Sequence, residues 1–232
     1  QNTAVGYKAL DANTTGTQNT VLGANAMEDA DGTESRNIAI GYASLNKLDG
    51  DTQYTGNGAI GYAAGYYITT GINNTHVGST AGYGASGALS TGDSNSTFGN
   101  SAGYLLQGAA AANTLIGDTA GNALQTGSNN ICIGYGSDCS AIDSGDQIVI
   151  GKSTTGIGDN YAVIGPAALT RLYVAADGAG VLYADGTINT SDKRTKENIN
   201  EMSLGLGFIN KLCPIEFEKR QPENYDEDLK SK

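Results

Sequence analysis

The sequence of 232 residues contains no Trp, three Phe, three Pro and a single His. Together with 34 Gly, this composition fits a rod with many turns and small interior residues better than a compact enzyme. Basic residues are also scarce, since 13 Lys and Arg stand against 24 Asp and Glu and leave a net charge of -11 at pH 7. Binding to phosphates needs clustered basic side chains, so this balance argues against a nucleic-acid partner.

Long apolar runs are absent as well. No stretch approaches the roughly 20 apolar residues of a membrane-spanning helix, and no signal peptide is visible, so we expect no insertion into a membrane. There are only three cysteines, and two of them, Cys132 and Cys139, belong to one repeat. Either a turn joins these two in a disulfide or, as we favour, they are small buried residues with free thiols.

Glycine, in contrast, is abundant, with 34 residues, and many of them mark a repeat. The repeat core reads Asn-x-x-apolar-Gly-x-x-Ala, and its glycine recurs at intervals of 14 to 21 residues, most often 17 or 18. The repeat glycines are Gly6, Gly23, Gly41, Gly61, Gly78, Gly99, Gly117, Gly134, Gly151 and Gly165. A fixed period of this length is typical of repeat architectures, in which one repeat forms one structural unit.

A short apolar segment, such as Ile131 to Ile133, precedes each repeat glycine. This pattern indicates a brief strand that ends in a sharp turn, where glycine tolerates backbone angles that other residues resist. Stacked coils would pair their strands about 4.8 Å apart. The sequence therefore predicts an all-β fold with a parallel β-solenoid or β-roll shaft over residues 1–152. The recurring Asn is expected to line the interior and to hydrogen-bond along the stack.

The strands are apolar on both faces. The residue two before the repeat glycine is apolar in eight of ten repeats, although alternation turns it away from its apolar neighbour. A thin solenoid has only one interior, so the second face needs other chains, and three copies around one axis are the simplest solution. We therefore predict a homotrimer. One His76 from each of the three chains would then form a ring around that axis, where the hypothesis is a metal or anion site. Apart from this hypothesis, we expect no metal centre and no cofactor.

Composition changes beyond the repeats. Residues 1–152 contain 16 charged side chains, and the much shorter stretch 191–232 contains 17. Residues 153–190 hold strand-like pieces separated by Asp-Gly turns, which predicts a short transition segment resembling a β-prism. Within the last segment, apolar residues spaced as in a short amphipathic helix precede Pro214. Because the chain begins with Gln1 and not with Met, we expect it to be a fragment of a longer protein.

The stretch from Ser191 to Ile199 reads Ser-Asp-Lys-Arg-Thr-Lys-Glu-Asn-Ile. It resembles the start of the intramolecular chaperone auto-processing domain found at the C-terminus of phage tail fibres and spikes, including endosialidases, and in some membrane-bound transcription factors. The family motif Ser-Asp-x-Arg-x-Lys-x-Asn is matched at Ser191, Asp192, Arg194, Lys196 and Asn198. The resemblance implies that residues 191–232 are the helical start of a truncated domain of this type, which trimerises and guides assembly of the shaft.

The resemblance also implies a single self-cleavage. Ser191 would attack the carbonyl of Thr190, with Lys196 as the general base. A lysine with a lowered pKa can activate a serine hydroxyl without a histidine. No activity on an external substrate is expected. The alternative interpretation is that Ser191 caps a helix and Lys196 is a solvated surface charge.

The repeats resemble, more loosely, the heads of trimeric autotransporter adhesins and the Asn-Thr-Ala-x-Gly-Tyr repeats of predicted tail fibres, most clearly at Asn2 to Leu10. Together the resemblances imply a structural and adhesive tail-fibre or spike shaft in the virion. Its partners would be other tail or fibre proteins and a host cell-surface glycan or protein. The alternatives are a trimeric adhesin on a bacterial surface and a polysaccharide-depolymerising spike, but the repeats lack a recurring pair of carboxylates.

Contacts with a host glycan are expected on loops, because binding sites tend to lie where loops leave a regular scaffold. The candidate glycan contacts are Tyr54, Tyr66 and Tyr67. By contrast, the tyrosines that directly follow a repeat glycine are expected to stack as a structural ladder; these are Tyr7, Tyr42, Tyr62 and Tyr135. One loop concentrates acidic residues, for which solvation or a calcium ion accounts equally well: Glu28, Asp29, Asp31 and Glu34.

Overall fold

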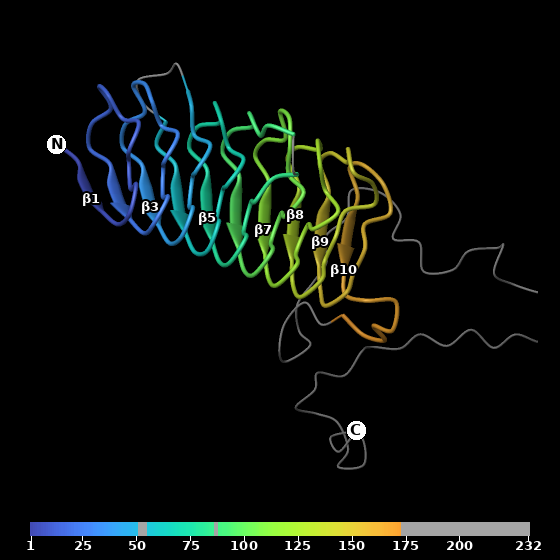
Figure 1. The fold of residues 1–232 in the computed structure, drawn as a ribbon. Coiled ribbons are helices and arrows are strands. Elements are labelled where there is room, and N and C mark those ends of the chain that lie inside the picture. Colours follow the sequence, from blue (N-terminus) through green and yellow to red (C-terminus); the bar gives the residue numbers. More distant parts are fainter. Residues whose placement is uncertain (51–54, 86–87, 173–232) are drawn as a thin grey trace, which may run out of the picture. The chain divides into compact units, whose positions relative to one another are not determined.

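The computed structural model describes residues 1–50, 55–85 and 88–172 (Figure 1). These residues form ten short strands and no helix. The strands are β1 (Thr3–Val5), β2 (Thr20–Leu22), β3 (Ile38–Ile40), β4 (Gly58–Ile60), β5 (Thr75–Val77), β6 (Ser96–Phe98), β7 (Thr114–Ile116), β8 (Ile131–Ile133), β9 (Ile148–Ile150) and β10 (Ala162–Ile164). The described residues therefore contain no helix that is long and apolar enough to cross a membrane. The predicted amphipathic helix before Pro214 lies outside the described residues.

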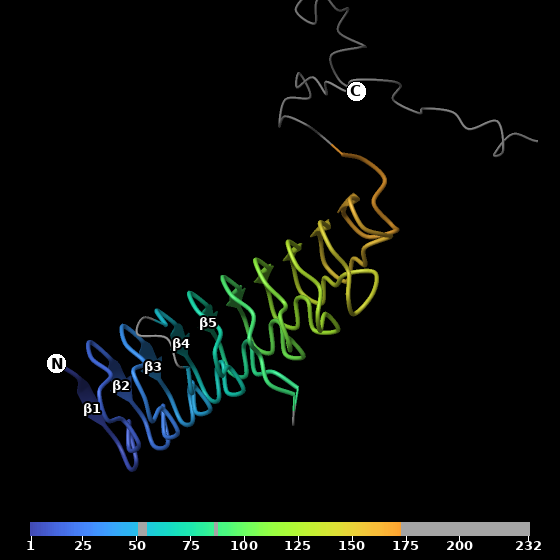
Figure 2. The same cartoon turned by 90° about the horizontal axis from the view of Figure 1, so that it is seen from above.

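All ten strands belong to one parallel sheet in chain order, so each coil lies on the one before it (Figures 1 and 2). The register is the same throughout. The central residue of each strand lies beside the central residue of the next, as Val21 lies beside Ala39. This arrangement confirms the predicted parallel β-solenoid, including the two degenerate repeats that form β9 and β10.

An asparagine ladder runs through the interior. The side-chain oxygen of Asn37 accepts a hydrogen bond of 2.8 Å from the backbone N–H of Asn57, its counterpart in the next coil. The same bond recurs at every step from Asn2 to Gln147. The amide nitrogen of Asn57 donates to the backbone carbonyl of Gly71, 14 residues further along the chain, at 2.8 Å. The side-chain oxygen and nitrogen of the ladder residues therefore both bind the backbone in the interior, which confirms the expected interior role.

The repeat glycine is required by the close approach of neighbouring coils. Gly23 has a φ of 141°, and the equivalent glycines have φ between 128° and 143°, except Gly165 at 88°. A Cβ added to Gly23 would collide with the carbonyl oxygen of Gly41 in the next coil. No side chain can be placed there without separating the coils, so the glycine fixes the corner that ends each strand.

The two faces of the sheet are unequal. The central residue of each strand points inward, and Val21, Ala39 and Val149 are at most 1% exposed. The residue before the glycine points outward, where Leu22 is 49% exposed and Ile60 is 44% exposed. Only the smaller of the two apolar columns therefore lies in the core of the chain, and the larger one forms an outer face. The number of chains in the assembly stays a prediction.

His76 lies in the interior and not at an axis between chains. It is the central residue of β5, only 2% of it is exposed, and its Nδ1 lies 2.8 Å from Oγ1 of Thr97. A Cβ at Gly82 would collide with the imidazole ring. The hypothesis of a ring of histidines around a trimer axis is therefore wrong, because alternation along the strand turns this side chain into its own coil.

The two cysteines of one repeat meet in the interior with free thiols. Cys132 and Cys139 are both buried, and their Sγ atoms lie 3.3 Å apart. The hydrogen bond with Cys139 and burial both raise the pKa of the Cys132 thiol. The favoured interpretation of small, buried, unpaired cysteines is therefore confirmed.

Replacing Asn95 by Leu tests the ladder, because leucine has a similar size and cannot form hydrogen bonds. The backbone N–H of Asn113 and the carbonyl of Ala110 would both lose their partner in the interior. We expect the free energy of unfolding to fall by about 3 kcal/mol, since each unsatisfied buried group costs roughly 1–3 kcal/mol. Equilibrium unfolding in urea measures this change. The exposed Asn100 serves as the control: Asn100→Ala should stay within about 0.5 kcal/mol of the unchanged protein.

A second prediction concerns acid and His76. Burial lowers the pKa of His76 to about 4, whereas an unfolded chain binds this proton near pH 6.5. As the pH falls from 6.5 to 4, the unfolded state gains a proton that the native state does not bind. We expect this histidine to cost about 3 kcal/mol of stability over that window and nothing above pH 6.5. His76→Gln removes the titration, so the difference between the two stability curves isolates it. Parallel curves would contradict the prediction.

Candidate functional site

Most residues of the predicted sites lie outside the described part of the chain. This holds for Tyr54 and for all residues of the expected self-cleavage site, which are Thr190, Ser191, Asp192, Arg194, Lys196 and Asn198. The self-cleavage therefore stays a prediction. Tyr66 and Tyr67 are described, and both belong to a cluster of aromatic rings on the side of the shaft.

Tyrosines form two stacked columns along the coils. In the column directly after the repeat glycine, the rings of Tyr42 and Tyr62 stack with centroids 5.5 Å apart. In the column five residues after the glycine, Tyr83 stacks on Tyr66 at 5.4 Å and on Tyr104 at 5.1 Å. Tyr67 packs edge-on against the second column. The first column comes from two coils and the second from three, and together they span four consecutive coils on one side of the shaft.

The predicted ladder is confirmed only in part. Tyr42 and Tyr62 stack as expected, but no other ring of the described residues stacks on Tyr7 or Tyr135. The residue at the equivalent position of the next coil is not aromatic: it is Ala24 beside Tyr7 and Lys152 beside Tyr135. A ladder needs an aromatic side chain in both neighbouring coils.

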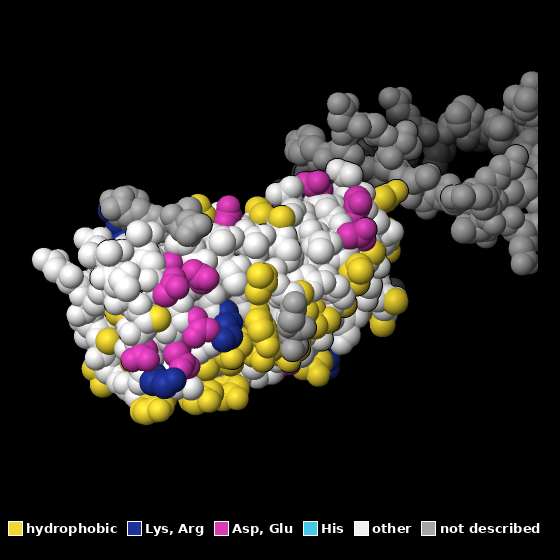
Figure 3. Space-filling view, turned by 45° about the horizontal axis from the view of Figure 1, so that its top comes forward, with side chains coloured by type: hydrophobic (Ala, Val, Ile, Leu, Met, Phe, Trp, Pro, Cys, Tyr) yellow, Lys and Arg dark blue, Asp and Glu magenta, His cyan; other side chains and the backbone are white. Residues whose placement is uncertain are grey.

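A groove of about 550 Å³ lies between the two columns. Its walls are the tyrosine rings, and between them stand the short side chains of Ala43, Ala63 and Thr80. Asn25, Asn46 and Lys47 contribute polar groups at the N-terminal end of the groove. In Figure 3, acidic and basic side chains at the N-terminal end of the stack border a hydrophobic area that continues toward the later coils. The groove is thus aromatic along its length and polar at one end.

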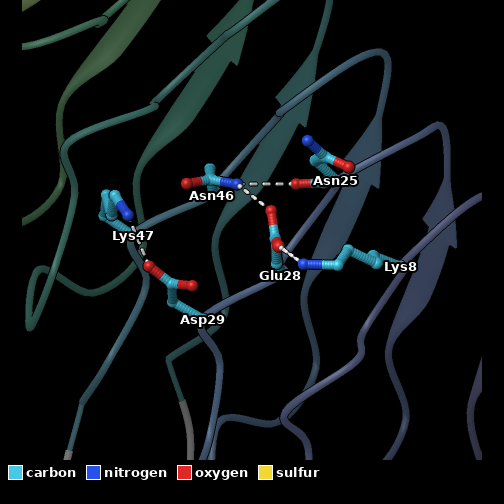
Figure 4. Close-up of polar contacts among 6 residues, drawn as sticks. All are labelled: Lys8, Asn25, Glu28, Asp29, Asn46 and Lys47. Carbon is cyan, nitrogen blue, oxygen red and sulfur yellow. Dashed lines mark hydrogen bonds and ion pairs between the residues drawn. The ribbon is translucent and has the colours of Figure 1, made fainter.

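Two ion pairs hold the polar end in place (Figure 4). Nζ of Lys8 donates to Oε1 of Glu28 at 2.6 Å, and Nζ of Lys47 donates to Oδ2 of Asp29 at 2.5 Å. Each pair joins two neighbouring coils. The hydrogen bond to Glu28 raises the pKa of Lys8, and the hydrogen bond to Asp29 raises that of Lys47. Both amines therefore remain charged at neutral pH.

The same end of the groove contains an unused hydrogen-bond acceptor. The side-chain nitrogen of Asn46 donates to the backbone carbonyl of Asn25 at 2.9 Å and lies 3.4 Å from Oε2 of Glu28 (Figure 4). Asn46 is 4% exposed, so its orientation is fixed. The side-chain oxygen Oδ1 of Asn25 is buried and accepts no hydrogen bond from the described residues.

The phenols of Tyr66 and Tyr83 are neutral. Burial raises the pKa of Tyr66, and burial is also the first cause of the raised pKa of Tyr83. Both groups therefore keep their proton at neutral pH and offer O–H donors and acceptors beside their ring edges.

A separate group of carboxylates lies further along the loops, where oxygens of Asp31, Glu34 and Asp49 come within 4.8 Å of one another. Glu34 is fully buried, but its two oxygens accept hydrogen bonds from the backbone N–H groups of Gly32 and Gly50 at 3.0 and 2.9 Å. These bonds give Glu34 a structural role that explains its burial without an ion.

The outer face of the sheet is the second notable surface. In Figure 2 the strands form a row along one side of the coil stack. None of the ten strands contains a charged residue. Strands about 4.8 Å apart make this face roughly 45 Å long. The large apolar side chains exposed on it are Val5, Leu22, Ile38, Ile60, Phe98, Ile116, Ile148, Ile150 and Ile164.

Comparisons of the chain with protein families, with curated proteins and with solved structures found no match. The tyrosine groove and the outer sheet face are therefore the basis for assigning a function, because the solenoid fold alone is compatible with many.

Proposed function

We propose that this chain is the shaft of a homotrimeric phage tail fibre or spike, a structural and adhesive protein of the virion that supports recognition of the host surface. The observation that carries the proposal is the outer sheet face. In all ten coils it carries an apolar residue directly before the glycine, and none of the strands contains a charged residue, although the chain as a whole has a net charge of -11.

Exposed apolar surface of this extent marks an interaction site. Monomeric soluble proteins rarely expose contiguous apolar patches larger than a few hundred Å². The absence of charged residues from the strands matches the centre of protein interfaces, where charged residues are depleted. Because every coil contributes an equivalent side chain, three parallel copies around one axis would bring the same columns together at every height. Cyclic symmetry of this kind gives a closed assembly.

The C-terminal residues extend the proposal to assembly. Their resemblance to the intramolecular chaperone domain supports a role in trimerisation, followed by cleavage between Thr190 and Ser191 with Lys196 as base. The released shaft would then attach to other tail or fibre proteins and meet a glycan or protein on the host. A bacterial surface adhesin would share the trimeric shaft, so the cleavage and not the trimer distinguishes the two functions.

The trimer is tested by placing charge on the outer face. In a background of Ser191→Ala, which keeps the chain whole, we expect a mass three times the 23.7 kDa of one chain. Ile60→Asp combined with Ile116→Asp should shift it to one chain, because burying an unpaired carboxylate is strongly unfavourable. Sedimentation equilibrium measures the mass. Ile142→Asp is the matched control, since Ile142 is 50% exposed but lies outside the strands, and it should leave the trimer intact. A monomeric starting protein would contradict the proposal.

Self-cleavage is tested by intact mass under denaturing conditions. The protein expressed with its native C-terminus should end at Thr190, whereas Ser191→Ala and Lys196→Ala should remain whole, because nucleophile or base is missing. Lys193→Ala serves as the control, since the family motif leaves this position open, and it should still be cut. If all four proteins stay whole, the proposed cleavage is wrong and the adhesin alternative is favoured.

A further inference from the structure

We infer that the groove between the two tyrosine columns binds a neutral oligosaccharide. The inference rests on the proposed adhesive function, because it names the part of the shaft that contacts the host surface and the chemical class of the ligand.

Aromatic faces at the ends of the columns suit a sugar ring. Tyr62 stacks on Tyr42 on one side only, because the next coil carries Ser79 at the equivalent position. Tyr62 remains 57% exposed, so part of its ring faces solvent at the rim of the groove. The C–H faces of a sugar pack against such a ring, and its hydroxyl groups stay free for hydrogen bonds. Pockets that bind small ligands combine aromatic walls with a few fixed polar groups in this way.

The polar end supplies the hydrogen bonds that a sugar requires. Sugar hydroxyl groups both donate and accept, and the groove offers both functions. The carboxylate oxygens of Glu28 and Asp29, which line the groove and are partly exposed, are acceptors. Lys47 and the tyrosine hydroxyl groups are donors. The ion pair of Lys47 with Asp29 fixes the position of its amine, so less entropy is lost on binding.

The charge of the groove selects a neutral ligand. The charged residues of its lining are Glu28, Asp29 and Lys47, and each is held in an ion pair, Glu28 with Lys8 and Asp29 with Lys47, so the groove offers no unpaired cation to an anionic ligand. The strong negative charge of the whole chain adds long-range repulsion of anions. An acidic polysaccharide would therefore find no free positive charge in the groove and would be repelled by the chain as a whole. The volume of about 550 Å³ falls in the range of sites for drug-sized ligands, such as a disaccharide.

The position of the groove leaves it accessible in the proposed trimer. Gly41 forms the corner between Ile40, on the outer sheet face, and Tyr42, on the groove wall. The groove thus belongs to the wall of the coil that follows the sheet. If three sheet faces meet at an axis, the trimer presents three grooves, and binding to a dense host surface gains strength from multivalency.

The test uses the full chain, with Ser191→Ala to keep it whole, on an array of immobilised glycans. The neutral probes are oligomers of glucose, galactose, mannose and N-acetylglucosamine, and the acidic probes are oligosialic acid and oligogalacturonate. We expect binding to at least one neutral probe and to neither acidic one. The soluble form of that probe is then titrated by calorimetry. Tyr62→Ala and Tyr83→Ala should each raise the Kd at least tenfold, whereas Tyr62→Phe, which keeps the ring, should change it less than threefold.

The matched control is Tyr135→Ala. Tyr135 occupies the same repeat position as Tyr62, is 58% exposed, and lies outside the groove, so its loss should leave the Kd unchanged. Thermal unfolding identifies any variant that has lost its fold, and Tyr62→Phe keeps the inference testable if an alanine variant fails. Binding to no neutral probe, binding to acidic probes alone, or an equal loss in Tyr135→Ala would each overturn the inference. A trimer that binds no glycan would refute the groove alone, whereas a monomer would refute the proposed function.

Discussion

Parallel, in-register stacking of coils at the spacing of paired strands is the constraint on which the whole structure depends. Three-residue strands form few hydrogen bonds each, so the stack also relies on the asparagine ladder, in which Asn37 binds the backbone of Asn57 and each later coil repeats the bond. The close approach at the corners admits only glycine, as at Gly23 against Gly41. Ladder and corner together fix the distance between coils.

That spacing also creates both surfaces for which a function is proposed. Equivalent positions of consecutive coils become neighbours, so a residue type that recurs builds a column. Tyr83 and Tyr104 stack for this reason, and Lys47 reaches Asp29 in the preceding coil. The exposed residue before each glycine, such as Ile60, becomes part of a continuous apolar face. Recognition and assembly are therefore proposed for two walls of one coil, separated by the corner glycine.

Much of the fold could be predicted from the sequence, whereas the groove could be predicted only in part. Strand positions, the parallel order and the interior ladder follow from one motif and its period. Tyr66 was predicted as a glycan contact, but Tyr83 and Tyr104, which complete its column, were missed. Counting five residues from each repeat glycine would have found them. Tyr67 was predicted as well, yet it packs against the column and does not line the groove.

By itself the sequence determined the repeat, and thus a solenoid, because a regular Asn and a glycine without a side chain permit close stacking of equivalent coils. Only the tertiary structure decided which apolar column lies inside. Ala39 and Ile40 are adjacent and both apolar, and alternation says only that they face opposite ways. The narrow interior, crossed by the asparagine side chains, has room for the smaller column, so the larger one faces outward. His76 belongs to the same inward-facing column as Ala39, and its side chain therefore lies in the core.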